Sequence, residues 1–265
     1  MSDLPIGALA LAAAVLFPGP YLWAPVLIFL TNRMSAKPRA TRFEAELASL
    51  PAAAAEYFAY AKGVLAGDGF EEAGMFFLPN TAPNVEALVL LARNRQSSEL
   101  ALAVAIYATV NGETQLKSTH VEYVSRYRDG RVLGTSNCSV LGCFAKIPGF
   151  ETAHFPRVQD LHQLYRLHTE RCRQAAPTGQ RINRLDDEFG GDGSLYLSTV
   201  MGEEYARQVP VGYLRLNADS EHYRPTIKGA CLMTWKSLWP VKQLRMQERD
   251  RRAARLIAVL LPATA

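Results

Sequence analysis

The sequence predicts an α+β fold: an N-terminal transmembrane segment followed by an antiparallel β-sheet domain flanked by helices. Three observations predict it. Residues 4–32 carry no charge, apolar runs separated by turn-forming residues follow from residue 70, and helical periodicity dominates from residue 157. We therefore expect a hydrophobic membrane anchor at 1–34, a basic linker at 35–42 and a cytoplasmic α+β domain at 43–265.

The anchor is predicted by its hydrophobicity and its length. Between Leu4 and Leu30 the chain has seven Leu, two Ile, two Phe and two Val. Together these residues favour insertion by roughly 4–8 kcal/mol, and the run exceeds the ~20 helical residues that span a bilayer. The side chains expected to contact lipid include Ile6, Leu16, Phe17, Trp23, Leu27 and Phe29. A cleaved signal peptide is disfavoured because the basic n-region is missing.

Prolines interrupt this anchor. Pro18, Pro20 and Pro25 each remove a backbone donor and disturb the preceding helical turn. The break near Pro18 divides the run into two halves, and each half is too short to cross a bilayer alone. Two arrangements remain, a kinked single crossing and a re-entrant hairpin with both ends on one side. We favour the kinked crossing, because irregular backbone at mid-membrane depth needs protein or water partners.

Basic residues after the anchor predict its orientation. Arg33, Lys37, Arg39 and Arg42 follow the apolar run, whereas only Asp3 precedes it. Cytoplasmic flanks of membrane segments are enriched in Lys and Arg. The positive-inside rule therefore places the C-terminal domain on the cytoplasmic side of a bacterial inner membrane.

The overall composition is ordinary for a globular protein. The chain is 49% hydrophobic and 20% charged, and it has no low-complexity tract. Its net charge of +4 is too small to indicate nucleic-acid binding. The four cysteines are too few and too dispersed for a disulfide scaffold, which agrees with a reducing compartment.

The domain is predicted to begin with a helix and to continue as a β-meander. Apolar residues recur at helical spacing over 43–66, with a break at Pro51. Turn-forming pairs such as Asn111-Gly112 and Asp129-Gly130 then separate five apolar runs. We place these strands at 70–78, 85–94, 100–110, 118–127 and 131–137. Their short connections permit only antiparallel neighbours, because parallel pairing requires a long crossover.

The remainder is predicted to be largely helical. An irregular stretch at 142–156 follows the strands, and one face of the sheet must be covered by the helices beyond it. We expect helices at 157–172, 195–207, 226–238 and 241–261, a short strand at 211–216, and a loop or short helix at 177–193. On the fourth strand, alternate residues share one face, namely Val121, Tyr123, Ser125 and Tyr127.

Three groups of residues have the composition of a reactive or metal site, but their spacing favours structural roles. His168 and Cys172 lie at i and i+4 of a helix, where they could form a ligand pair or a nucleophile and its base. A packed thiol beside a hydrogen-bonded histidine is the commoner arrangement. Cys138 and Cys143 lack the two-residue gap of a redox or zinc motif. The acidic residues Asp186, Asp187, Glu188 and Asp192 depart from the spacing of a calcium loop, which favours a solvated turn.

The last two predicted helices carry an aromatic and basic cluster. Its residues are Trp235, Lys236, Trp239, Lys242 and Arg245. Tryptophan beside lysine is typical of a membrane headgroup boundary, where each basic residue adds about 1 kcal/mol of attraction to an anionic leaflet. The alternative, which we favour, is an ordinary amphipathic pair with Leu244, Leu256, Ile257 and Leu260 in the core and the arginines in water.

The sequence contains no nucleotide-binding, hydrolase, kinase or metalloprotease motif. We therefore predict no cofactor and no metal, and a binding or scaffold role toward the lipid bilayer or a protein partner. The alternative is an enzyme acting on a membrane-proximal or lipid substrate, with His168, Cys172 or the acidic loop contributing. An enzyme should gather titratable side chains in one apolar pocket, whereas a binding module should present a broad exposed apolar or basic surface.

Overall fold

The computed structural model describes residues 19–82, 84–110, 112–175 and 179–261. The predicted α+β class, with a mainly antiparallel sheet flanked by helices, is confirmed. The chain divides into two compact units. Unit 1 contains residues 1–36, 142–145 and 205–246, and unit 2 contains residues 37–141, 146–204 and 247–265.

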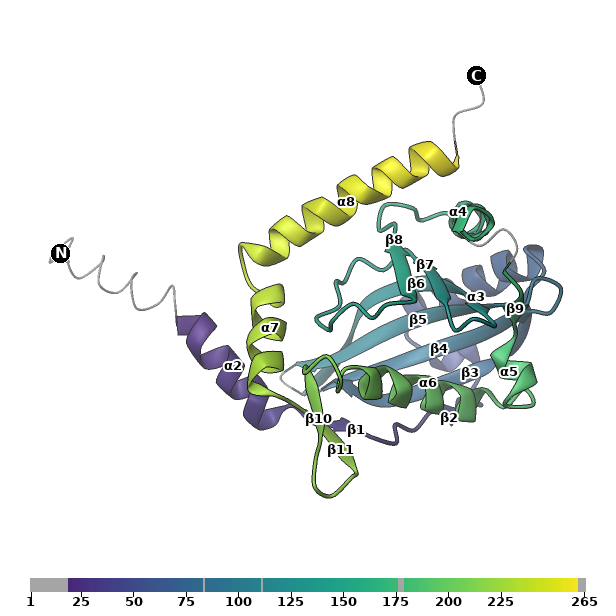
Figure 1. Ribbon diagram of the computed structural model, residues 1–265. Helices are drawn as coiled ribbons and strands as arrows, with labels where there is room; N and C mark the ends of the chain where they lie inside the picture. Colours follow the sequence, from purple (N-terminus) through teal and green to yellow (C-terminus); the bar gives the residue numbers. More distant parts are fainter. Residues whose placement is uncertain (1–18, 83, 111, 176–178, 262–265) are drawn as a thin grey trace, which may run out of the picture. The chain divides into compact units, whose positions relative to one another are not determined.

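Unit 2 is built on one large sheet (Figure 1). Its strands follow chain order: β2 (Thr41–Arg42), β3 (Glu71–Ala82), β4 (Val85–Asn94), β5 (Glu99–Val110), β6 (Glu113–Tyr127), β7 (Val132–Ser136) and β8 (Phe150–His154). The two-residue strand β9 (Arg181–Ile182) pairs with the end of β6. Neighbours from β2 to β7 are antiparallel, and from β3 to β7 the short connections between the predicted strands require this.

Strand β8 differs from the expectation for its segment. Residues 142–156 were expected to be irregular, but β8 pairs with β7, and the pair is parallel. The loop that joins β7 to β8 is long enough to return the chain to the start of β7, which parallel pairing requires. Few apolar residues mark this edge strand, so the pattern of the sequence did not reveal it.

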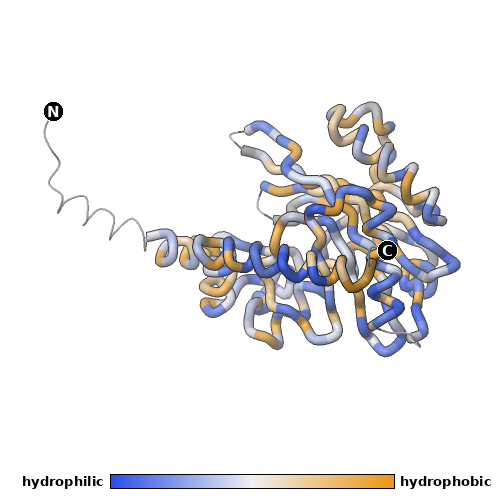
Figure 2. Tube along the Cα trace, turned by 90° about the horizontal axis from the view of Figure 1, so that it is seen from above, coloured by the Kyte–Doolittle hydropathy of each residue, from blue (hydrophilic) through white to orange (hydrophobic). Residues whose placement is uncertain are grey.

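The central strands are covered on both faces. On β4, Leu88 and Leu90 enter one hydrophobic cluster, whereas Val89 and Leu91 enter the cluster on the other face. Burial on both sides explains why this strand is a continuous apolar run rather than an alternation. Figure 2 shows hydrophobic residues, in orange, recurring along the described chain.

Helices form these two clusters together with the sheet. The helices are η1 (Leu47–Ser49), α3 (Ala52–Gly67), α4 (Leu161–Ala175), α5 (Arg184–Asp187), α6 (Gly193–Arg207) and α8 (Val241–Leu260). On one face the core includes Phe58 of α3, Leu164 of α4 and Leu260 of α8. On the other face it includes Leu185 of α5 and Leu197 of α6.

The helix expected at 43–66 is shorter than predicted. A 3-10 turn precedes it, and α3 begins only at Ala52, directly after Pro51. Pro51 is extended (φ −52°, ψ 137°), so it lies outside the helix as its N-cap. Proline cannot donate a helical hydrogen bond, and it restricts the residue before it to extended conformations, so the two helical segments cannot join here.

Unit 1 combines two helices with a small sheet. Its elements are α2 (Gly19–Thr31), β1 (Met34–Ser35), β10 (Leu214–Leu216), β11 (His222–Pro225) and α7 (Ile227–Ser237). The strands pair in the order β1-β11-β10, and α2 lies beside α7 (Figure 1). A separate cluster that includes Tyr205, Tyr213 and Met233 forms its core.

Helix α2 coincides with the second half of the predicted anchor. It runs through Pro25 and is 13 residues long. The first half of the predicted anchor, with Ile6, Leu16 and Phe17, lies outside the described residues. Among the residues that the structure describes, no helix combines the length and the apolar character needed to cross a bilayer.

Candidate functional site

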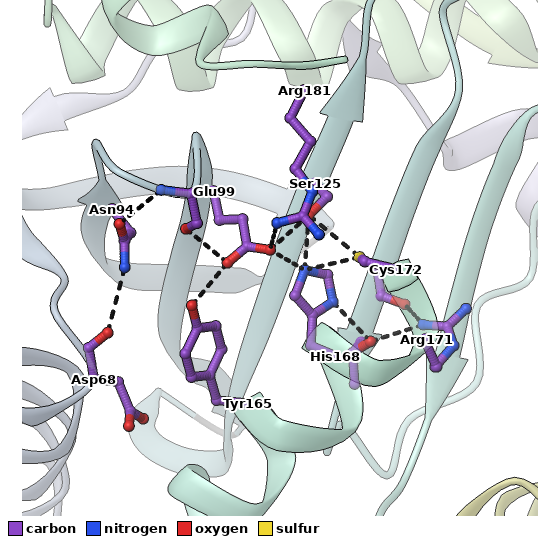
Figure 3. A network of polar contacts seen from close by, with 12 residues as sticks. Asp68, Asn94, Glu99, Ser125, Tyr165, His168, Arg171, Cys172 and Arg181 are labelled. Atoms are coloured by element: carbon purple, nitrogen blue, oxygen red, sulfur yellow. Dashed lines mark hydrogen bonds and ion pairs between the residues drawn. The ribbon is translucent and has the colours of Figure 1, made fainter. Parts of the chain in front are cut away.

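A cluster of four polar side chains is enclosed between the sheet and α4 in unit 2. Its members are Glu99, Ser125, His168 and Cys172, which we call the buried cluster (Figure 3). All four residues are buried. Tyr165, Thr135, Arg171 and Arg181 surround them and make hydrogen bonds to them or to one another.

The sheet places Glu99 and Ser125 side by side. The turn before β5 is closed by Asn94, whose side-chain oxygen accepts hydrogen bonds at 3.0 Å from the backbone nitrogens of Gln96 and Ser97. Glu99 is the first residue of β5, and it pairs directly with Ser125 of β6. Residues directly opposite in an antiparallel pair extend to the same face, so both side chains point toward α4.

Helix α4 supplies the imidazole of His168 and the thiol of Cys172 to the buried cluster. Tyr165, His168 and Cys172 are three and four residues apart, so they form one stripe along the helix. Leu161 and Leu164 of the same helix are buried in the core, which fixes this stripe against the sheet. The prediction that His168 and Cys172 share a helical face agrees with their contact, since His168 Nε2 lies 3.7 Å from Cys172 Sγ.

The carboxylate of Glu99 is fully hydrogen-bonded. Its Oε1 accepts from Ser125 Oγ at 3.1 Å and from Arg181 Nη1 at 2.5 Å. Its Oε2 accepts from Tyr165 Oη at 2.9 Å and from Ser97 Oγ at 2.8 Å. Arg181 thus compensates a negative charge that is otherwise removed from water, which is the condition under which a buried carboxylate is tolerated.

His168 is held by a hydrogen bond at each ring nitrogen. Nδ1 lies 2.9 Å from Thr135 Oγ1, and Nε2 lies 3.0 Å from Ser125 Oγ. Burial, followed by the charges of Arg171 and Arg181, lowers the pKa of His168 to about 3. The imidazole is therefore neutral at physiological pH, with one nitrogen available as an acceptor.

Cys172 completes the cluster. Its Sγ lies 3.4 Å from Ser125 Oγ, and the ligand atoms of Glu99, His168 and Cys172 all lie within 4.8 Å of one another. A carboxylate, an imidazole and a thiol in this arrangement can form a hydrogen-bonded network or ligate a metal ion. A nucleophilic role is poorly supported, because the thiol is buried away from solvent and substrate.

Two hollows of unit 2 lie away from the buried cluster. One, of about 470 Å³, is lined by residues that include Tyr57, Tyr60 and Asn137. The other, of about 90 Å³, is lined by residues that include Phe155 and Ile257. Neither hollow is lined by a member of the buried cluster, so neither gives a substrate access to His168 or Cys172.

The acidic loop has a structural explanation. Asp186 forms an ion pair with Arg93 and accepts a hydrogen bond from Asn183 at 2.7 Å. Arg184 pairs with Glu188 at 2.6 Å and with Glu203. These contacts balance acidic charge with arginine. The other two candidate residues, Cys138 and Cys143, are not joined by a disulfide.

In unit 1, the predicted lipid-facing residues are partly placed. Trp23 and Leu27 of α2 are exposed, and the guanidinium of Arg215 lies 5.8 Å from the ring centre of Phe29. The predicted topology-determining residues Arg33, Lys37, Arg39 and Arg42 are exposed.

The aromatic and basic cluster near the C-terminus has two kinds of member. Trp235, Trp239 and Lys242 are exposed. Lys236 donates to the carbonyl of Phe144 at 2.8 Å, and Arg245 donates to the carbonyls of Lys236 and Gly142 at 3.0 and 2.8 Å. Lys236 and Arg245 therefore stabilise the internal structure of unit 1.

The second half of α8 belongs to unit 2. Leu260 is buried in its core, and Leu256 and Ile257 pack against that core, as expected for an ordinary amphipathic helix. Arg249 donates to the carbonyl of Ser139 at 2.6 Å. Leu244, near the start of the helix, is exposed instead of buried.

Three residues of the site were not identified from the sequence: Glu99, Ser125 and Arg181. One signal was present, since Ser125 lies among Val121, Tyr123 and Tyr127 on the face that the alternation of β6 marks as buried. A serine on such a face requires a polar partner. Arg181 gave no comparable signal, because it follows a segment without periodicity.

We expect the neutral state of His168 to be visible in the pH dependence of stability. Below pH 6.5 the unfolded chain binds a proton that the folded protein does not, so the stability that His168 contributes falls as the pH falls toward 3. The difference in unfolding free energy between the wild type and His168→Gln should therefore narrow by about 1.4 kcal/mol between pH 7.5 and 5.5. Urea unfolding of both proteins at the two pH values, with a chelator present, measures this difference. A difference that stays constant or widens on acidification would contradict the prediction.

Comparison of the chain with protein-family models, with curated proteins and with solved structures finds no match in any of the three. The functional conclusion therefore depends on the chemistry of the two units themselves.

Proposed function

We propose that this protein is a membrane-bound binding or scaffold protein, in which unit 1 contacts the lipid bilayer and unit 2 is the attached cytoplasmic α+β domain. One observation carries the proposal: α2 exposes its apolar side chains, and none of its described residues is buried. Leu22, Trp23, Leu27 and Leu30 are between 58% and 70% exposed. A soluble surface helix normally hides such residues against a core.

Helix α7 adds a second apolar stripe beside α2. Ile227 and Trp235 are exposed and lie eight residues apart, on one side of the helix, and the exposed Trp239 follows its end. Transfer of apolar surface out of water is worth about 25 cal/mol per Å², so exposed side chains of this size favour an apolar environment. Tryptophan is also the side chain most enriched at the boundary between headgroups and acyl chains.

The surrounding charge supports a lipid surface over a protein groove. Arg33 lies two residues after the end of α2, and Lys242 lies three residues after Trp239; both side chains are exposed. The uncharged sequence that ends in α2 extends back to Leu4. A long uncharged run followed by basic residues is typical of a membrane segment whose C-terminal flank stays in the cytoplasm, and the finer proposal is a single kinked crossing at the inner membrane.

Vesicle flotation with the full chain tests the proposal. We expect the protein to float with vesicles and to bind more strongly when they contain anionic lipid. All three tryptophans (Trp23, Trp235 and Trp239) lie in unit 1, so a blue shift of tryptophan emission on vesicle binding reports on that unit alone. Brominated lipids should quench this emission if the side chains enter the acyl region.

Matched variants localise the contact. Leu22→Ser/Leu27→Ser on α2 should weaken vesicle binding at least about tenfold, since each buried leucine contributes roughly 1.5–3 kcal/mol. Leu195→Ser, at a leucine of unit 2 that is 53% exposed, should leave binding unchanged. The proposal fails if the full chain stays monodisperse in detergent-free buffer and does not float. A C-terminal reporter that is active only outside the cytoplasm would reject the orientation.

A further inference from the structure

We propose that Glu99, Ser125, His168 and Cys172 form a tetrahedral binding site for a divalent transition metal, with Zn²⁺ as the ion whose ligand preferences fit it. This inference concerns unit 2 alone and does not depend on membrane binding. It revises the expectation from the sequence, which favoured a packed thiol beside a hydrogen-bonded histidine and predicted no metal.

The donor set selects the class of metal. Thiolate, imidazole and carboxylate are the usual protein ligands of zinc, and Cys172, His168 and Glu99 supply one of each, with the neutral hydroxyl of Ser125 as a weaker fourth donor. Magnesium and calcium require oxygen donors, which Glu99 and Ser125 supply in too small a number within this cluster. The mixture of one sulfur, one nitrogen and oxygen therefore favours zinc or a neighbouring first-row ion over the hard cations.

The spacing of the four atoms suits a tetrahedron. A zinc ion with bonds of about 2.0–2.3 Å holds its ligand atoms about 3.3–3.7 Å apart. From His168 Nε2 the distances are 3.0 Å to Ser125 Oγ, 3.7 Å to Cys172 Sγ and 3.8 Å to Glu99 Oε1. From Ser125 Oγ they are 3.1 Å to Glu99 Oε1 and 3.4 Å to Cys172 Sγ. Shifts of a few tenths of an ångström convert this arrangement into a coordination shell.

The outer contacts are those that metal ligands need. The Nδ1 atom of His168 is fixed by Thr135, which directs Nε2 toward the other ligands. Ligating histidines almost always bind a partner through their second nitrogen, which fixes tautomer and orientation. Tyr165 donates a hydrogen bond to Oε2 of Glu99, which leaves Oε1 directed at Ser125 and His168. Arg181 also contacts Oε1, so its charge opposes the ion and sets an upper limit on affinity.

The site is closed, which gives it a structural rather than a catalytic character. All four residues are buried, whereas catalytic zinc keeps a position open to water or substrate. An ion here would join β5, β6 and α4, and its binding energy would add to the stability of unit 2.

Cobalt substitution tests the site. The full chain is unfolded in chelator, refolded with Co²⁺ and examined by absorption spectroscopy, while the metal content of the untreated protein is measured by elemental analysis. We expect one Co²⁺ per chain, a thiolate-to-cobalt charge-transfer band in the near ultraviolet, the visible bands of tetrahedral cobalt, and loss of all of them on adding Zn²⁺. If the refolded wild type binds no stoichiometric metal and shows no charge-transfer band, the cluster is only a hydrogen-bonded network and the proposal is wrong.

Variants assign the ligands. Cys172→Ser should abolish the charge-transfer band, whereas Cys231→Ser, at an exposed thiol outside the cluster, should retain it. The reverse result would place the metal elsewhere and overturn the proposal. Thr135→Val keeps all four ligands and removes the partner of His168, so it should weaken cobalt binding about 10–100-fold with the band unchanged in shape. This variant also keeps the test decisive if Cys172→Ser does not fold.

Discussion

Replacing Arg181 with methionine is expected to destabilise unit 2 by about 3–5 kcal/mol, because it leaves the Glu99 carboxylate charged and buried without its counterion. The carboxylate of Glu99 is 1% exposed, and Arg181 is the arginine that donates to it, at 2.5 Å. Ser97, Ser125 and Tyr165 would still donate to Glu99, but neutral donors do not replace a charge. Urea unfolding followed by far-UV circular dichroism, with a chelator present, measures the loss.

A second variant separates the effect of charge from that of packing. Glu99→Gln in the Arg181→Met background removes the unpaired charge and keeps a side chain of similar shape. This double variant should recover most of the lost stability, because replacing both partners of a buried ion pair is often nearly neutral. Arg157→Met is the matched control, since Arg157 is 87% exposed and lies 3.8 Å from Asp250. Its effect should stay within about 0.5 kcal/mol. A loss of the same size in the single and double variants would mean that packing, rather than charge, dominates.

The sheet of unit 2 was largely predictable because its strands obey local rules. Turn residues such as Asp129-Gly130 separate apolar runs, and short connections impose antiparallel order, so β3 to β7 follow the expected positions. On β6 the alternation of buried and partly exposed residues gave the correct inward face. Strand β8 was missed because its pairing depends on a long loop and an edge position, neither of which leaves a periodic signal.

The buried cluster was only half predictable. Helical spacing places His168 beside Cys172 whatever the rest of the fold. Their approach to Glu99 depends on the register of β5 against β6 and on the position of α4 above them, which are tertiary facts. Glu99 also lies at the edge of a turn, where a charged residue ordinarily faces water. Only the complete fold shows that this residue points inward.

The hydrophobic N-terminal segment is the opposite case to the buried cluster. Its composition predicts insertion without any reference to tertiary structure. The structure places Gly19–Thr31 in α2 and leaves Leu22 and Trp23 exposed, so burial of these side chains requires an apolar phase outside the protein. The decisive measurement on this segment is therefore one that includes a bilayer.

Gly229→Ala is expected to disrupt unit 1 by about 3 kcal/mol, at the upper end of the range for overpacking. A methyl group at Gly229 would lie 1.9 Å from the carbonyl oxygen of Tyr213. That carbonyl accepts a hydrogen bond from the backbone nitrogen of Thr226 at 3.0 Å, and Thr226 in turn caps α7 by accepting from Gly229. The obstacle is backbone that is already bonded to the start of the helix, so α7 must move as a whole or lose its cap.

The consequence should be specific to one unit. Because the three tryptophans lie in unit 1, their emission and near-UV circular dichroism should change in Gly229→Ala, while the unfolding of unit 2 followed by far-UV circular dichroism changes little. Gly142→Ala is the control within unit 1, since a methyl group there meets nothing within 4 Å. If α7 and α2 together form the lipid-binding surface, Gly229→Ala should also weaken vesicle flotation, although it removes no apolar side chain. A variant that keeps the wild-type tryptophan signals and binds vesicles normally would show that the start of α7 can shift away from Tyr213 at little energetic cost.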